Sequence, residues 1–150
     1  MVIKMEKEDI HFNFDEIIEF GALFQQRIFK PYYDLYTGYL SKLQAEALAF
    51  VCNNPGKRIK ELNLALSIDK QYGSKIVKVL IYEGLITKQE STIDKRNQVL
   101  YATEKGIEIL GEKVKESNML FSRKTDNLTK KEKEEMIEAF SKLNNLLTKI

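Results

Sequence analysis

The chain of 150 residues contains only one cysteine and one histidine. Cys52 alone cannot form an internal disulfide framework, and His11 alone leaves no cluster of thiol or imidazole ligands for a transition metal. No apolar run approaches the roughly 20 residues that a membrane-spanning helix needs, and the first residues, MVIKMEKEDIHF, lack the apolar core of a secretory signal. These absences predict a cytoplasmic protein without a metal, a cofactor or a membrane partner.

Catalytic motifs are missing as well. The chain has no nucleophile, base and acid set that includes histidine, and no phosphate-binding loop of the G-x-x-x-x-G-K-[ST] type. Its carboxylates fall on helix faces that are predicted to be exposed. We therefore expect a protein that is not an enzyme, with a hydrophobic content of 43% that is sufficient for a buried core.

The positive charge is unevenly distributed. The net charge is only +2, but lysine and arginine exceed aspartate and glutamate by four over residues 57–105, against −3 over residues 1–56 and +1 over residues 106–150. An excess of this size also occurs on ordinary solvated surfaces. It indicates a nucleic-acid partner only in combination with other features.

Two helices are predicted before the Asn-Asn-Pro-Gly stretch that ends at residue 56. Residues 15–36 repeat apolar side chains every three or four positions, which is typical of one helical face. Pro31 removes a backbone donor, so we expect a kink or break near residues 29–31. Ser41 and Gln44 have the spacing of a capping box and predict the start of the second helix.

The order of elements from Asp69 to Gly106 is the most informative feature. After a short helix at residues 59–66, Asp69 is the predicted N-cap of a lysine-bearing helix that ends at Gly84. A strand, a polar tip over residues 89–97 and a second strand follow. A polar helix followed at once by a hairpin with a basic tip is the order of a winged helix-turn-helix domain. The buried side of its helix is predicted to consist of Ile76, Val77, Leu80 and Ile81.

Two further helices follow the hairpin. Thr103 is the predicted N-cap of the first, and Thr129 and Glu132 form a capping box for the second. Their narrow apolar stripes, together with the first helix, offer more apolar surface than the winged-helix core can cover, so we expect a second copy of the chain to pair with them. The candidate dimerisation residues are Ile17, Phe20, Phe121, Met136, Phe140, Leu143 and Leu147.

These elements define a mainly α fold with a small β-hairpin (α+β). We expect a winged helix-turn-helix with flanking dimerisation helices. Residues 41–103 form the predicted DNA-binding domain, and residues 1–40 and 104–150 form the helical dimerisation region.

The outer face of the helix after Asp69 carries short polar and long cationic side chains, as a helix that reads the major groove needs. Gln71 can reach an adenine edge and Lys75 a guanine edge, while neighbouring residues hold phosphates. The alternative is a solvated amphipathic helix with scattered lysines. The candidate DNA-binding residues, including those of the hairpin tip, are Lys70, Gln71, Tyr72, Ser74, Lys75, Lys78, Lys95 and Arg96.

The hairpin tip favours DNA over the alternative. Lys95 and Arg96 at the end of a wing can enter the minor groove, where the negative potential favours arginine. Asp94 is expected to pair with a nearby cation and hold the tip in shape, although an ordinary turn aspartate would look the same in sequence.

With these features the chain resembles the multiple antibiotic resistance regulators, the MarR family, over residues 15–148. The matching segments are LSKLQAEALAFVCNNPG, IKELNLALSI, KVLIYEGLI and DKRNQVLYATEKG. The last contains the family's Asp-x-Arg followed by a strand and Thr-x-x-Gly, here Asp94, Arg96, Thr103 and Gly106.

The resemblance implies a triangular homodimer in which each winged helix reads half of an inverted repeat. By similarity, Arg96 enters the minor groove and the major groove is faced by Gln71, Tyr72, Ser74 and Lys75. The chain departs from the family at Gln71, Gly73 and Ala102, where relatives often have serine or threonine, an aliphatic residue and leucine. Because glycine inside a helix costs roughly 1 kcal/mol relative to alanine, the reading helix is expected to be weaker or adaptable.

Many such regulators respond to small aromatic or drug-like effectors, to oxidants or to metals. The tyrosines near the end of the first helix either form the candidate ligand pocket, with Tyr32, Tyr36 and Tyr39, or an aromatic packing cluster. Cys52, on the apolar side of its helix, is expected to be structural rather than a redox switch.

The sequence therefore predicts a homodimeric DNA-binding transcription regulator, and more specifically a repressor, that reads a pseudo-palindromic promoter site and is relieved by a small ligand. The alternative is a winged-helix protein interaction module without sequence-specific DNA binding, since fold alone does not determine function. Such a module would need a flat apolar patch where this helix carries lysine and glutamine.

Overall fold

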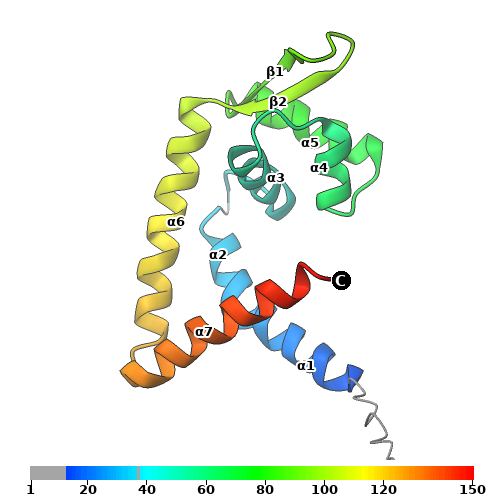
Figure 1. Cartoon of the computed structure of the whole chain (residues 1–150). Helices are drawn as coiled ribbons and strands as arrows, with labels where there is room; N and C mark the ends of the chain where they lie inside the picture. Colours follow the sequence, from blue (N-terminus) through cyan, green and yellow to red (C-terminus); the bar gives the residue numbers. More distant parts are fainter. Residues whose placement is uncertain (1–12, 37) are drawn as a thin grey trace, which may run out of the picture.

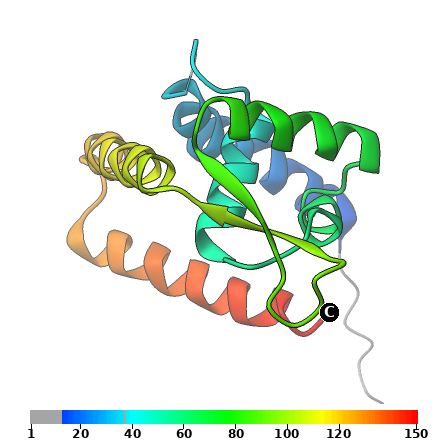
Figure 2. The ribbon, with the colours of Figure 1, turned by 90° about the horizontal axis from the view of Figure 1, so that it is seen from above.

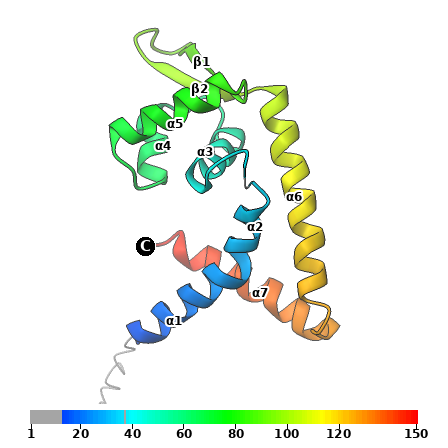
Figure 3. The same ribbon diagram turned by 180° about the vertical axis from the view of Figure 1, so that it is seen from behind.

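The computed structural model describes residues 13–36 and 38–150. A winged helix-turn-helix occupies one end of the molecule, and the long helix α6 leads from it to the other end, where α1 and α7 cross (Figures 1 and 3). The mainly α fold with one hairpin is therefore confirmed. The elements are α1 (Phe14–Phe24), η1 (Gln25–Phe29), α2 (Lys30–Asp34), α3 (Lys42–Asn53), α4 (Ile59–Ala65), α5 (Lys70–Tyr82), β1 (Ile86–Glu90), β2 (Gln98–Ala102), α6 (Glu104–Lys124) and α7 (Lys130–Leu147).

The first predicted helix is interrupted by a π-helical segment, η1, which leads into the stretch where a kink or break was expected, residues 29–31. In η1 the backbone N–H of Lys30 donates to the carbonyl of Gln25, five residues earlier. Pro31 then falls in the first turn of α2, where its missing N–H is tolerated. The change in hydrogen bonding thus lies in the turn before the proline, where the α-helical pattern gives way to a π-helical one.

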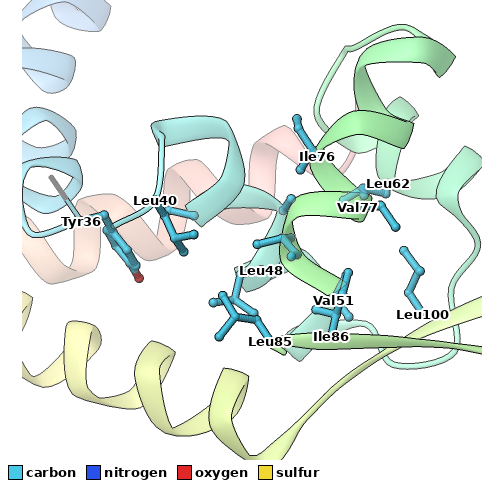
Figure 4. Close-up of a cluster of buried hydrophobic side chains, with 13 residues drawn as sticks. Tyr36, Leu40, Leu48, Val51, Leu62, Ile76, Val77, Leu85, Ile86 and Leu100 are labelled. Atoms are coloured by element: carbon cyan, nitrogen blue, oxygen red, sulfur yellow. The ribbon is translucent and has the colours of Figure 1, made fainter. Parts of the chain in front are cut away.

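The core lies between α3, α4, α5 and the hairpin. Leu48 and Val51 of α3 meet Leu62 of α4, and Ile76, Val77 and Leu80 of α5 cover them together with Leu85, Ile86 and Leu100 (Figure 4). The predicted buried side of α5 is confirmed for three residues and wrong for Ile81, which is 39% exposed. Ile81 lies at the edge of the apolar face.

The hairpin pairs β1 with β2 in antiparallel register, with Ile86 opposite Ala102 and Glu90 opposite Gln98. The tip is therefore shorter than predicted, spanning residues 91–97. A single bridge between Lys57 and Leu100 attaches the hairpin to the segment before α4.

The predicted caps of the C-terminal helices are confirmed. The Thr103 hydroxyl accepts from the backbone N–H of Gly106, and Thr129 and Glu132 form the reciprocal capping box. Neither α1 nor α7 has a buried residue. Of the helices in residues 13–36 and 38–150, none combines the length and apolarity needed to cross a membrane.

A junction of backbone contacts joins the end of α5 to the start of α6. Gly84 ends α5 with a φ of +70°, a value that favours glycine. The Thr103 hydroxyl donates to the Gly84 carbonyl at 2.7 Å, and the Thr103 N–H donates to the Leu85 carbonyl at 3.0 Å. Gly106 packs so closely on Leu85 that a β-carbon there would overlap the Leu85 carbonyl oxygen.

Two glycines of α6 provide a matched test of this junction. Gly106→Ala should destabilise the protein by about 1–3 kcal/mol, because the new methyl group meets backbone that cannot rotate away. Gly111→Ala, where nothing lies within 4 Å of the added carbon, should stabilise it by up to about 1 kcal/mol through helix propensity. Urea unfolding at one protein concentration measures both. Equal effects of the two substitutions would contradict the close contact.

Candidate nucleic-acid interface

The outward face of α5 presents a polar stripe. Asp69 caps the helix by accepting from the Tyr72 N–H at 2.8 Å. Gln71, Lys75 and Lys78 then follow at spacings of four and three, which place them on one face, all exposed. Tyr82 continues the same stripe and is 88% exposed. Tyr82 was not among the residues predicted from the sequence, although its spacing of four residues from Lys78 indicates that it shares their helix face.

The other predicted residues of α5 lie on its two flanks. Tyr72, 45% exposed, lies on the side of Val79. Lys70 and the half-buried Ser74 lie on the opposite side and line a groove shared with α4 and β1. The residues predicted as one set are therefore divided between the stripe and its two flanks.

Gly73 does not belong to the reading face, contrary to the sequence interpretation. It is buried, and a β-carbon on it would overlap the side-chain amide of Asn63. The glycine therefore lets α4 and α5 approach each other closely. Its position thus gives it a packing role between the two helices.

Asp94 organises the hairpin tip. One carboxylate oxygen accepts from the backbone N–H of Arg96 at 3.1 Å and from its Nε at 3.2 Å, and the other accepts from Asn97 Nδ2 at 3.1 Å. Ser91 adds its hydroxyl as acceptor for the N–H groups of Ile93 and Asp94. The Arg96 side chain remains 92% exposed despite the ion pair, so its guanidinium is presented to solvent by a turn of defined shape. Lys95 is exposed beside it.

Removal of the Asp94 carboxylate should weaken the hydrogen bonding of the hairpin tip and leave the rest of the fold unchanged. In Asp94→Ala the Arg96 amide has no acceptor, so its hydrogen exchange should accelerate about fivefold, as expected for a bond of about 1 kcal/mol. The free energy of unfolding should change by less than about 1 kcal/mol. Asp126→Ala, which removes an exposed carboxylate from the α6–α7 turn, serves as control. Unchanged exchange at Arg96 would show that Asp94 does not hold the tip.

The stripe and the wing belong to neighbouring elements, because α5 packs against β1. α5 and the hairpin lie side by side at the end of the molecule opposite α1 and α7 (Figures 1 and 2). A rigid helix of cationic and amide side chains next to an exposed arginine has the chemistry to contact base edges and phosphates simultaneously.

The three tyrosines of the candidate ligand pocket do not lie together around one cavity. Tyr36 is fully buried, and its hydroxyl lies 3.1 Å from that of Tyr32. Burial, followed by this hydrogen bond, raises the pKa of Tyr36. Tyr39 is 42% exposed. A cavity of about 300 Å³ between η1, α2 and α6 is lined by Tyr32, not by Tyr36 or Tyr39, and its rim carries Arg27 and Lys124.

Cys52 is half-buried beside this aromatic cluster, and burial raises the pKa of its thiol. A raised thiol pKa lowers the thiolate fraction, and hence the reactivity, at neutral pH. His11 lies outside the described residues.

The candidate dimerisation residues all lie at the α1 and α7 end or on α6. Ile17, Phe20, Leu143 and Leu147 are between 40% and 55% exposed. Phe121, Met136 and Phe140 are half-buried. The Phe140 ring meets Phe24 edge to face at 5.7 Å, which joins α7 to α1 within one chain.

Comparisons with known proteins agree with this geometry. The model of the MarR family matches residues 40–97, from the start of α3 to the wing tip. Among curated proteins no match is found.

Solved structures extend the likeness to the whole fold. The MarR protein from Peptoclostridium difficile is 27% identical, with a TM-score of 0.67 over 98% of this chain and 92% of the other. A MarR family protein from Bacillus stearothermophilus is 16% identical, with a TM-score of 0.77 over 92% and 99%. FabT from Streptococcus pneumoniae, solved in complex with DNA, is 16% identical, with a TM-score of 0.68 over 91% and 99%.

Proposed function

We propose that the chain is a MarR-family homodimeric transcription regulator that binds a pseudo-palindromic promoter site. Residues 40–97 match the model of the MarR family, and the fold resembles that of solved MarR proteins. The observation that carries the proposal is the exposed polar stripe of α5, which lies next to a hairpin whose tip presents the exposed Arg96. α5 enters the major groove, the wing reaches the adjacent minor groove, and occupation of the promoter represses transcription.

The polar chemistry of α5 supports DNA over a protein partner. A protein-binding winged helix would present a flat apolar patch, whereas the stripe carries Gln71, Lys75 and Lys78, with Tyr82 at its end. A tyrosine in this place is compatible with DNA, since its hydroxyl can donate to a phosphate.

The exposed apolar faces of α1 and α7 support the dimer. Within one chain, neither helix has a buried residue. Their large apolar side chains Phe14, Ile18 and Ile137 are 60–70% exposed. Large exposed apolar side chains gathered on two helices of a monomer support an interaction site there. A second copy in two-fold symmetry would cover the same residues on both chains and place two α5 helices about one turn of DNA apart.

The candidate effector site is the cavity beside Tyr32. It lies between η1 and α6, the helix that leads directly to the winged domain. A small aromatic or drug-like molecule with an acidic group would match its apolar walls and the cations Arg27 and Lys124 at its rim. Binding there would act on α6 and thereby on α5.

Selection of genomic DNA fragments on the purified protein tests the function. We expect enrichment of an inverted repeat whose half-sites lie about one helical turn apart. Sedimentation of the free protein at micromolar concentration should give the mass of a dimer. Absence of any enriched repeat at moderate salt, or a stable monomer, would contradict the proposal.

The wing is tested separately by Arg96. Arg96→Ala should weaken binding to the selected site by about 1–3 kcal/mol, because no guanidinium then enters the minor groove. Arg96→Lys keeps the charge but not the planar guanidinium, and its affinity should fall between the two. Fluorescence anisotropy at constant salt measures the affinities. If Arg96→Ala binds like the unmodified protein, the wing takes no part in recognition.

A further inference from the structure

A second basic feature lies beside the reading stripe, in the groove between α4, α5 and β1. The groove has a volume of about 610 Å³ and is lined by Ile59, Lys60, Asn63, Lys70, Ser74 and Lys88. Lysines from three separate elements thus converge on one depression. Lys60 and Lys88 were not among the residues predicted from the sequence.

These lysines differ from the basic residues just before α4 in forming no ion pair with another described residue. Just before α4, Lys57 and Arg58 both pair with Glu61. Within residues 13–36 and 38–150, by contrast, none of the three groove lysines forms an ion pair. Three cations around one depression without an acidic partner create a positive potential that attracts an anion.

The walls of the groove suit a phosphate that is attached to sugar. Lysine side chains cover apolar surface with their stems while the ammonium groups stay in water, so the stems and Ile59 offer apolar walls below a charged rim. The half-buried Ser74 adds a hydroxyl donor.

The Asn63 amide completes the polar set. Its Oδ1 is buried and has no hydrogen-bond partner in the described part of the chain. This oxygen lies against Gly73, at a place that a β-carbon on that residue would overlap. Gly73 makes room for this amide between α4 and α5.

We propose that this groove holds the DNA sugar–phosphate backbone next to the major groove that α5 reads, with Lys60 and Lys88 binding phosphates. The inference rests on the proposed function. Lys70 and Ser74, one turn apart on the flank of the stripe, connect the two surfaces, because DNA seated on Gln71 and Lys75 places its flanking strand along this side of α5. These lysines position the protein and carry no sequence information.

The salt dependence of DNA binding tests the assignment. For Lys60→Gln and Lys88→Gln, the slope of log affinity against log salt should decrease in magnitude by about 0.9 for each phosphate that the variant no longer neutralises. Affinity at about 0.1 M salt should fall roughly fivefold to tenfold, equally for the selected site and for unrelated DNA. Lys130→Gln removes a 91% exposed lysine from α7 and should change neither quantity.

The phosphates that the lysines bind are located by neutral methylphosphonate linkages, placed one at a time along the selected site. At one backbone position, the neutral linkage should weaken DNA binding by the unmodified protein but should not weaken DNA binding by the Lys60→Gln variant any further. A second position should respond in the same way to Lys88→Gln. Lack of any such coupling would overturn the assignment.

The remaining outcomes separate this inference from the proposed function. Unmodified protein that binds no DNA overturns both. Variants with unchanged slopes overturn only the groove assignment, and weakening confined to the selected site would show that the lysines read bases instead.

A second experiment uses inorganic phosphate, which is added to the free protein at constant ionic strength. If millimolar phosphate raises the melting temperature of the unmodified protein but not of the Lys60→Gln, Lys88→Gln double variant, the groove is a small-anion site and the DNA assignment is wrong.

Discussion

The close packing of Gly106 on the Leu85 carbonyl determines how the two ends of the molecule are related. α5 ends at Gly84, and α6 begins at the Thr103 cap. The Thr103 hydroxyl and N–H both bond to the carbonyls that follow α5. Because these bonds join the segment just after α5 to the N-cap of α6, α5 cannot turn relative to α6 without breaking them. In the proposed dimer, the angle and spacing of the two reading helices follow from this junction.

A second connection lies on the other side of the winged domain. Tyr36 and Leu40 are buried against the core, and the Tyr33 hydroxyl donates to Glu46 of α3. Burial, and then this bond to a carboxylate, raise the pKa of Tyr33. The winged domain is thus attached to the helical end through α2 as well as through α6. The cavity beside Tyr32 lies between these two attachments, where a bound molecule would press on both.

The sequence predicted the elements that depend on local spacing and failed where distant segments decide. The caps at Ser41, Asp69, Thr103 and Thr129 were predictable because a side chain and an N–H three residues later suffice to form them. Gly73 was misinterpreted because its neighbour Asn63 belongs to another helix. The groove was missed for the same reason, since Lys60 and Lys88 lie far apart in sequence and meet only through the packing of α4, α5 and β1.

The lysines on α5 fit either a DNA-reading helix or a solvated amphipathic helix, and the distribution of acidic residues along the sequence helps to choose between the two. A solvated helix balances its lysines with glutamates one turn away, as α7 does at 130–134, 131–135 and 138–142. Between Lys70 and Tyr82 there is no acidic residue at all. Each lysine of α5 therefore keeps its full charge toward solvent, and Lys75 and Lys78 repel each other at close spacing. A helix that only needed solubility would gain from a glutamate at this face, so its absence favours an anionic partner over a merely hydrated surface.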